Sequence, residues 1–551
     1  MAEFYIDPAL GNDADGGSIA YPWKTISKAN ANLLAGDVVY LMNGTHNDRI
    51  FPSHSGSAGN PITYKNYPGH IPTLKGTNQG YGVFRFSVGR NYFIIDGISV
   101  DGSPRDNSLP QWWFVWNEGD YNIIQNCSLI NGTAGVDGGV RILGNYNKLL
   151  NCRVAHAGCY NLGDVWIEGS YNLVDGCSIM DIGHDCINNF GHHNIIRNND
   201  LYNPIYRVAD AAHSGGSDAR AYLIFDGNRV HGSPIHGMQA NSPYQIIRRN
   251  TVYDNSQHGL GIYGGQPGVG SSSHSRIYNN TFYNNGGVAV KLNKNGTDSI
   301  DIVLKNNISY KNVGGFTWYE NVDPANQNEI NNFNGDPRFV DEDNRDFRLA
   351  ADSPCRNAGA FLTLTIGAGS GISIPVVDAS YFIDGFGIVA GDIVQLQGNP
   401  GLFTIVGIDY TANTITVDRP TAWTDGQGIA LGRIDTAPNI GAYEYQEETM
   451  ATKKSVSFTL VVSAAPDFFP AILPSSLSVA KGVVAVYQIT FTAQGGFAGP
   501  VTLAVLNLPT GAVATFSKIS INVTETSTLS ITTAAVSLGT FSLILEGTAT
   551  I

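Results

Sequence analysis

Short apolar runs recur along the first two thirds of the chain with a spacing of about 25 residues. They read YNIIQNCSL from Tyr121, YNKLLNCRV from Tyr146 and YNLVDGCSI from Tyr171. Each run places apolar residues before an Asn or Cys, then one variable residue and another apolar residue. A fixed period of this size indicates stacked repeats. Because the runs are short, broken by Asn and Gly, and lack a 3.6-residue period, they predict β-strands.

One position of the repeat can be followed from coil to coil at intervals of 22 to 30 residues. A coil built from strands and turns without a helix fits a parallel β-helix. Buried polar groups need partners, so we expect the asparagines at this position to form an internal ladder between coils. The cysteines there are expected to pack as small buried residues, since no CxxC pair suggests a metal site. The position is occupied by Ile98, Cys127, Cys152, Cys177, Asn199, Asn228, Asn250, Asn280 and Asn307.

The N-terminal region has a different pattern. The sequence predicts a helix near this end over residues 23–35. We expect this helix to cover the open first coil, because solenoids require a cap. The strings DPALGNDADGG, PWKTISKA, AGDVVYLMNGTH and GNPITYKNYPG, together with the coils, resemble right-handed β-helix proteins that act on carbohydrates, including polysaccharide lyases and alginate epimerases. The resemblance covers roughly residues 1–360, and it implies the fold and a carbohydrate-directed activity without specifying one reaction.

Two further β regions are predicted beyond the coils. FRLAADSPCRNAGA and PNIGAYEY resemble the usual end of such domains, and the stretch between them alternates apolar residues. From about residue 454 charge nearly vanishes, and the sequence resembles bacterial immunoglobulin-like modules with strands and turns typical of a β-sandwich. We therefore predict an all-β chain with a right-handed parallel β-helix over 1–360 plus 438–449 (cap about 1–50), a small inserted β module over 361–437 and an immunoglobulin-like β-sandwich over 450–551.

Composition narrows the function classes. The formal net charge is -14 and no basic run is present, which argues against a nucleic-acid partner. No apolar stretch reaches 18 residues, so no membrane span is expected. Residues 1–10 lack a basic, apolar signal segment. We expect an extracellular protein, either secreted after removal of a signal or associated with a virion.

Histidines precede the second strand of several coils. His184 in GHDC, His213 in AHSG, His236 in IHGM and His258 in QHGL lie 29, 23 and 22 residues apart. If NPIYRVADA is an insertion, they share one slot on coils about 4.8 Å apart. We expect such neighbouring imidazoles to depress one another's pKa values, which leaves a neutral base for proton transfer. Stacked turn residues, or a metal site that includes Asp185, remain alternatives.

Outward-facing residues on these strands complete the candidate site. Alternation points Arg141, Trp166, Gln239 and Tyr263 outward along one face. Lys291 falls near the same strand of the following coil, where it can neutralise a uronate carboxylate. No cofactor is required by this set, although a divalent cation such as calcium stays open. The predicted catalytic residues are His184, Asp185, His213, His236, His258 and Lys291, and the predicted substrate-contacting residues are Arg141, Trp166, Arg220, Gln239 and Tyr263.

Related enzyme classes give partial motif matches. Pectin-hydrolysing β-helix enzymes carry GDDC, GHG and RIK motifs, which GHDC (183–186), QHGLGI (257–262) and AVKLN (289–293) resemble, but His184 replaces one carboxylate. An inverting hydrolase needs two carboxylates about 6.5–9.5 Å apart, and Asp164 with Asp185 is the nearest candidate pair. The DPH motif of alginate epimerases is absent.

A lyase needs a base, an acid and a charge neutraliser, which His, Tyr, Lys and Arg supply without a carboxylate pair. We therefore predict a polysaccharide-active enzyme, preferably a lyase that cleaves an anionic, uronate-containing polysaccharide by β-elimination. A glycoside hydrolase of the phage-tailspike kind and a non-catalytic glycan-binding adhesin are the alternatives.

Overall fold

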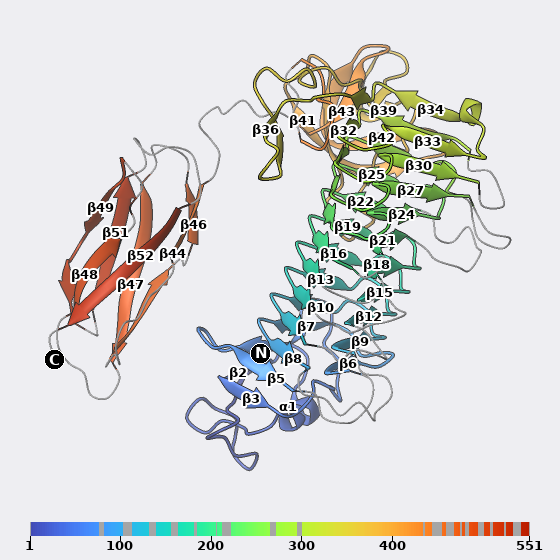
Figure 1. The fold of residues 1–551 in the computed structure, drawn as a ribbon. Helices are drawn as coiled ribbons and strands as arrows, with labels where there is room; N and C mark the ends of the chain where they lie inside the picture. Colours follow the sequence, from blue (N-terminus) through green and yellow to red (C-terminus); the bar gives the residue numbers. More distant parts are fainter. Residues whose placement is uncertain are drawn as a thin grey trace. The chain divides into compact units, whose positions relative to one another are not determined.

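The chain divides into two compact units, Met1–Tyr445 and Gln446–Ile551 (Figure 1). The computed structural model describes residues 2–75, 82–102, 113–131, 139–155, 164–180, 185–204, 207–211 (backbone only), 222–264, 272–294, 300–432, 436–443 and parts of 454–549. Within these residues, no helix has the length and apolar character needed to cross a membrane.

Three long parallel sheets form the first unit. The coil that starts near Tyr121 contributes β10 (Ile123–Gln125), β11 (Ser128–Ile130) and β12 (Val140–Ile142), one to each sheet, and the next coil pairs with it in register. The sheets contain 13, 12 and 10 strands in an order that follows the chain. The predicted all-β class and parallel β-helix are therefore confirmed.

The 10-stranded sheet positions the candidate site, so its strands are given in full. They are β6 (Phe84–Phe86), β9 (Val115–Asn117), β12, β15 (Val165–Ile167), β18 (Asp185–Asn189), β21 (Arg207–Ala211), β24 (Met238–Ala240), β27 (Leu260–Tyr263), β30 (Val290–Asn293) and β33 (Thr317–Glu320).

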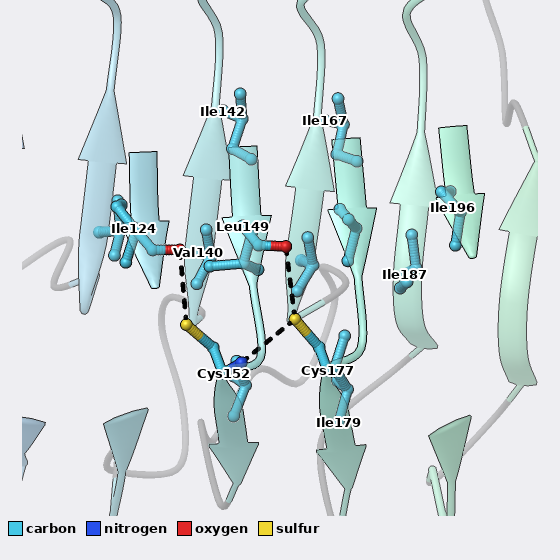
Figure 2. Close-up of a cluster of buried hydrophobic side chains, with 14 of the residues drawn as sticks. Ile124, Val140, Ile142, Leu149, Cys152, Ile167, Cys177, Ile179, Ile187 and Ile196 are labelled. Atoms are coloured by element: carbon cyan, nitrogen blue, oxygen red, sulfur yellow. Dashed lines mark hydrogen bonds between the residues drawn. The ribbon is translucent and has the colours of Figure 1, made fainter. Parts of the chain in front are cut away.

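The predicted cysteine and asparagine positions lie inside the solenoid. Cys152 and Cys177 are each 2% exposed, and their thiols donate to the carbonyls of Ile124 and Leu149 in the neighbouring coil (Figure 2). Further along, each Asn side-chain oxygen accepts the backbone N–H of the preceding coil, as in the 2.9 Å bond from Asn228 to Asn250. The same bond continues through the ladder of Asn199, Asn228, Asn250, Asn280, Asn307 and Asn332, which confirms the prediction.

The first residue of each repeat stacks on the surface, a feature that we did not predict. Tyr121, Tyr146 and Tyr171 adopt φ values of 58°, 56° and 59°, in the left-handed region that most side chains avoid. Their ring centroids lie 4.9–5.0 Å apart from coil to coil. The stacked rings offset part of the backbone strain, because offset aromatic pairs are attractive beyond the area that they bury.

A short helix caps the first coil. α1 (Ile26–Asn32) begins after Thr25, whose side chain accepts from the N–H of Lys28. Ile26, Ala29 and Leu33 are buried in the solenoid core, as expected for a cap. The helix is shorter than predicted, because Trp23 already pairs with Ile6 and Leu33 is extended.

A six-stranded antiparallel sheet, from β38 (Thr363–Leu364) to β43 (Gly428–Leu431), covers part of the 13-stranded sheet. Arg248 links the two, since its buried guanidinium contacts Asp226 of the β-helix at 2.9 Å and Asp392 of the small sheet at 2.6 Å. The second unit contains one five-stranded and one four-stranded sheet. The predicted domain boundaries and the immunoglobulin-like assignment stay predictions.

Candidate functional site

A row of outward-facing side chains crosses the 10-stranded sheet. Strand pairing aligns Arg141 with Trp166, and Gln239 with Gly261 and Lys291. Tyr263 lies two residues beyond Gly261, opposite Asn293 in the neighbouring outward row. In order along the sheet, the aligned residues with described side chains are Arg85, Trp116, Arg141, Trp166, Asn188, Gln239, Lys291 and Trp318. Position 210, described by its backbone alone, pairs between Asn188 and Gln239, and Gly261 pairs between Gln239 and Lys291.

His236 and Tyr263 form a hydrogen-bonded pair on this face. The Tyr263 hydroxyl lies 2.7 Å from Nε2 of His236. His236 is only 7% exposed, whereas Tyr263 is partly exposed, so Tyr263 is the more accessible residue of the pair. The ring reaches back along its own strand over Gly261, where a methyl group would lie 2.7 Å from Cε2 and 3.3 Å from the hydroxyl oxygen. The missing side chain at Gly261 therefore makes the contact with His236 possible.

His258 stacks beside His236, with ring centroids 5.1 Å apart. Its Nδ1 accepts the N–H of Val288 at 3.1 Å, which places the proton of the neutral ring on Nε2. Burial, and secondly the charge of Lys291, lower the pKa of His258 to about 4. His258 is thus neutral near pH 7. We expected neighbouring imidazoles to lower this pKa, and that expectation is wrong. Burial lowers it most, and the charge of Lys291 lowers it further.

Lys291 is held between an acid and an aromatic ring. Its Nζ lies 2.9 Å from Oε2 of Glu320 and 4.2 Å from the centre of the Trp318 ring. His258 contacts the same indole edge-on, with centroids 5.6 Å apart. We did not predict Glu320 or Trp318. The available signal was a recurring Trp-x-Glu in VWNEG, VWIEG and TWYEN.

A similar group of a cation, a Trp and a carboxylate occurs towards the other end of the row. Arg141 Nε donates to Glu168 at 3.1 Å, and Trp166 Nε1 donates to that carboxylate at 2.7 Å. Gln239 faces outward between the two ends. Predicted site residues at this end therefore lie on the same face as the His236 pair but several coils away from it.

Three predicted residues, His184, His213 and Arg220, lie outside the described residues. The expectation that NPIYRVADA is an insertion is wrong, because Arg207–Ala211 form β21, which pairs with β18 and β24. In sequence His213 therefore follows the strand of its coil, whereas His236 and His258 precede theirs.

Asp185 is 1% exposed. It lies two residues before the buried Ile187 on β18, so both side chains point to the inner side of the sheet. Neighbouring Asp164 is fully buried, and burial together with Asp185 raises its pKa well above the usual range. The carboxylate oxygens of Asp164 and Asp185 are of the type that binds calcium. No group of three or more His, Cys, Asp or Glu side chains suited to a metal occurs among the described residues.

Two family models cover the coils. A model described as "Pel9A-like, right handed beta helix region" matches residues 4–153, and a second, "Right handed beta helix region", matches residues 163–334. The coiled region is a right-handed parallel β-helix. The predicted fold resemblance is therefore confirmed, including its hand.

Individual relatives of this β-helix are distant. The chain is 23% identical over 442 residues to "Uncharacterized protein YwoF" of Bacillus subtilis (strain 168). The match covers 64% of this chain and 92% of that protein. Solved structures that are similar include pectate lyase Pel9A (18% identity, 67% of this chain and 94% of that one, TM-score 0.42). Another is a rhamnogalacturonan lyase (19% identity, 60% and 87%, TM-score 0.41).

One group of titratable side chains lies on or next to β24, β27 and β30. A phenol is hydrogen-bonded to an imidazole, a second imidazole is neutral, and an ammonium group lies on the strand next to the phenol. Such a set can move a proton and stabilise a developing negative charge. It joins His236, His258, Tyr263 and Lys291, four of the predicted residues.

Proposed function

We propose that this protein is a polysaccharide-active enzyme that cleaves a uronate-containing polysaccharide by β-elimination at His236, Tyr263, His258 and Lys291. The observation that carries the proposal is the 2.7 Å hydrogen bond between Tyr263 and His236 on the strand next to Lys291. This bond couples the phenol of a partly exposed residue to a buried imidazole. The partner is an anionic polysaccharide, and the place of action is outside the cell, by secretion or on a virion.

The buried imidazole and the more exposed phenol divide the proton transfer. Tyr263 gives its proton to Nε2 of His236, and the resulting phenolate removes the proton on the carbon next to the uronate carboxylate. The bond between the β-carbon and the glycosidic oxygen then breaks, and a carbon–carbon double bond forms. The phenol that has just gained a proton returns it to the leaving oxygen, and the proton on His236 goes back to the phenolate.

Lys291 stabilises the negative charge that develops on the uronate when its α-proton leaves. A fixed cation in a partly buried site interacts more strongly with such charge than water does. Its side chain is 12% exposed and is held over Trp318, so little conformational freedom is lost when substrate binds. His258 packs against His236 and, being neutral, does not oppose the protonation of that ring.

The described carboxylates favour elimination over hydrolysis. A hydrolase needs two accessible carboxyl groups on either side of the scissile bond. Asp164 and Asp185 are buried, while Glu168 and Glu320 are each paired with a cation. The histidine, tyrosine and lysine set therefore gives the better chemical account of this face.

A polysaccharide panel tests the proposal. The purified chain is incubated with uronate-containing and neutral polysaccharides, and products are followed by ultraviolet absorbance of the unsaturated uronate and by mass. We expect an absorbing product from one uronate polymer and its loss in Tyr263→Phe, which keeps the ring and removes the proton donor. New reducing ends without absorbance would establish hydrolysis instead, and binding without cleavage would establish an adhesin.

A further inference from the structure

The proposed catalytic cluster lies at one end of the outward row. Lys291 is on β30, and only β33 follows it in the 10-stranded sheet (Figure 1). On the other side eight strand spacings, about 38 Å at about 4.8 Å each, separate β30 from β6. A polymer that lies across the strands therefore has a long surface on one side of Lys291 and about 5 Å on the other.

Trp318 occupies the last position of the row. Its side chain is 43% exposed, in contrast to Trp116, which is 8% exposed at the other end. Lys291 covers its ring at 4.2 Å and His258 meets it edge-on, so the remaining indole surface is open to solvent. An exposed, rigidly held aromatic ring offers apolar area for a sugar ring at little entropic cost.

From this asymmetry we infer that the enzyme acts exolytically: it removes one or two sugar units at a time from one end of the polysaccharide, with the terminal sugar stacked on Trp318. The inference rests on the proposed function, because it takes the cluster around Tyr263 as the place of cleavage. Beyond β33, no strand extends the row in the part of the chain that the structure describes. The long side, which includes Arg141 and Trp166, holds the rest of the polymer.

Product size against time tests this mode of action. The full chain is incubated with the polysaccharide that yields absorbing product, and absorbance is compared with polymer mass by size-exclusion chromatography. We expect unsaturated mono- or disaccharide from the earliest samples while the polymer mass falls slowly. An early spread of oligosaccharides with a rapid fall in polymer mass would overturn the exolytic inference and leave β-elimination intact. If no absorbing product forms from any polymer, both proposals are overturned.

A substitution at Trp318 tests the terminal subsite separately. We expect Trp318→Ala to raise KM about tenfold, as for loss of one well-packed aromatic contact, and to lower kcat as well, because the same ring holds Lys291. Tyr21→Ala removes a ring that is 66% exposed in the N-terminal cap, away from this face, and should leave KM unchanged. An unchanged KM in Trp318→Ala would refute the role of this ring.

Discussion

Gly261 provides the sharpest perturbation of the proposed site. In Gly261→Ala the added methyl group would lie 2.7 Å from Cε2 of Tyr263 and 3.3 Å from its hydroxyl oxygen. Non-bonded carbon atoms rest at about 3.5–4.0 Å, so the ring has to move by about 1 Å. The backbone tolerates alanine, because Gly261 does not adopt a positive φ. The substitution therefore displaces the Tyr263 ring without removing either of the two side chains of the proposed pair.

The expected loss follows from the geometry of the Tyr263–His236 bond. A shift of about 1 Å takes the hydroxyl from 2.7 Å to beyond hydrogen-bonding distance of Nε2. Misplacement of this size costs about 100-fold in rate. We expect kcat to fall about 100-fold, and the free energy of unfolding to change by less than about 1 kcal/mol.

A double-mutant cycle separates this effect from general damage. Initial rates of absorbing product are measured for wild type, Gly261→Ala, Tyr263→Phe and the double variant, and urea unfolding is measured for each. If Gly261 acts through the Tyr263 hydroxyl, the double variant should be as slow as Tyr263→Phe alone, because the two losses are not additive. Full activity in Gly261→Ala, or an additional 100-fold loss in the double variant, would refute the reasoning.

Three further predictions concern charge, the asparagine ladder and pH. Lys291→Gln should lower kcat by about 100- to 1,000-fold, whereas Lys291→Arg, which keeps the charge, should lose less, as initial rates will show. Asn250→Ala should lower the free energy of unfolding in urea by about 2–5 kcal/mol, because its side-chain amide bonds the coils on both sides, while Asn328→Ala on an exposed strand should stay within about 0.5 kcal/mol. The pKa of His258 is lowered from 6.5 to about 4, so between these pH values the unfolded chain binds a proton that the folded chain does not. Stability from this group should therefore be lost as pH falls from about 6.5 to 4, and a His258→Gln variant with an unchanged slope of stability against pH in this window would contradict the assignment.

Strand alternation and the repeat period located much of the candidate site. The period identified the coils, and alternation identified Arg141, Trp166 and Gln239 as outward-facing. Counting from the ladder position also brought His236 and His258 together, which their stacked rings confirm. These features depend on spacing along the chain, and a solenoid converts such spacing directly into distance because each coil rises by the same amount.

The sequence by itself determined the solenoid, its interior ladder and the face on which the candidate site is proposed. The tertiary structure alone decided which side chains touch on that face. Alternation places Tyr263 outward, and the repeat places His236 just before the preceding strand, but neither says that the phenol reaches back over Gly261 to that imidazole. Likewise, the pairing of Lys291 with Glu320 depends on how two coils lie beside each other. Rotamers and contacts between coils arise from packing, which a one-dimensional period does not encode.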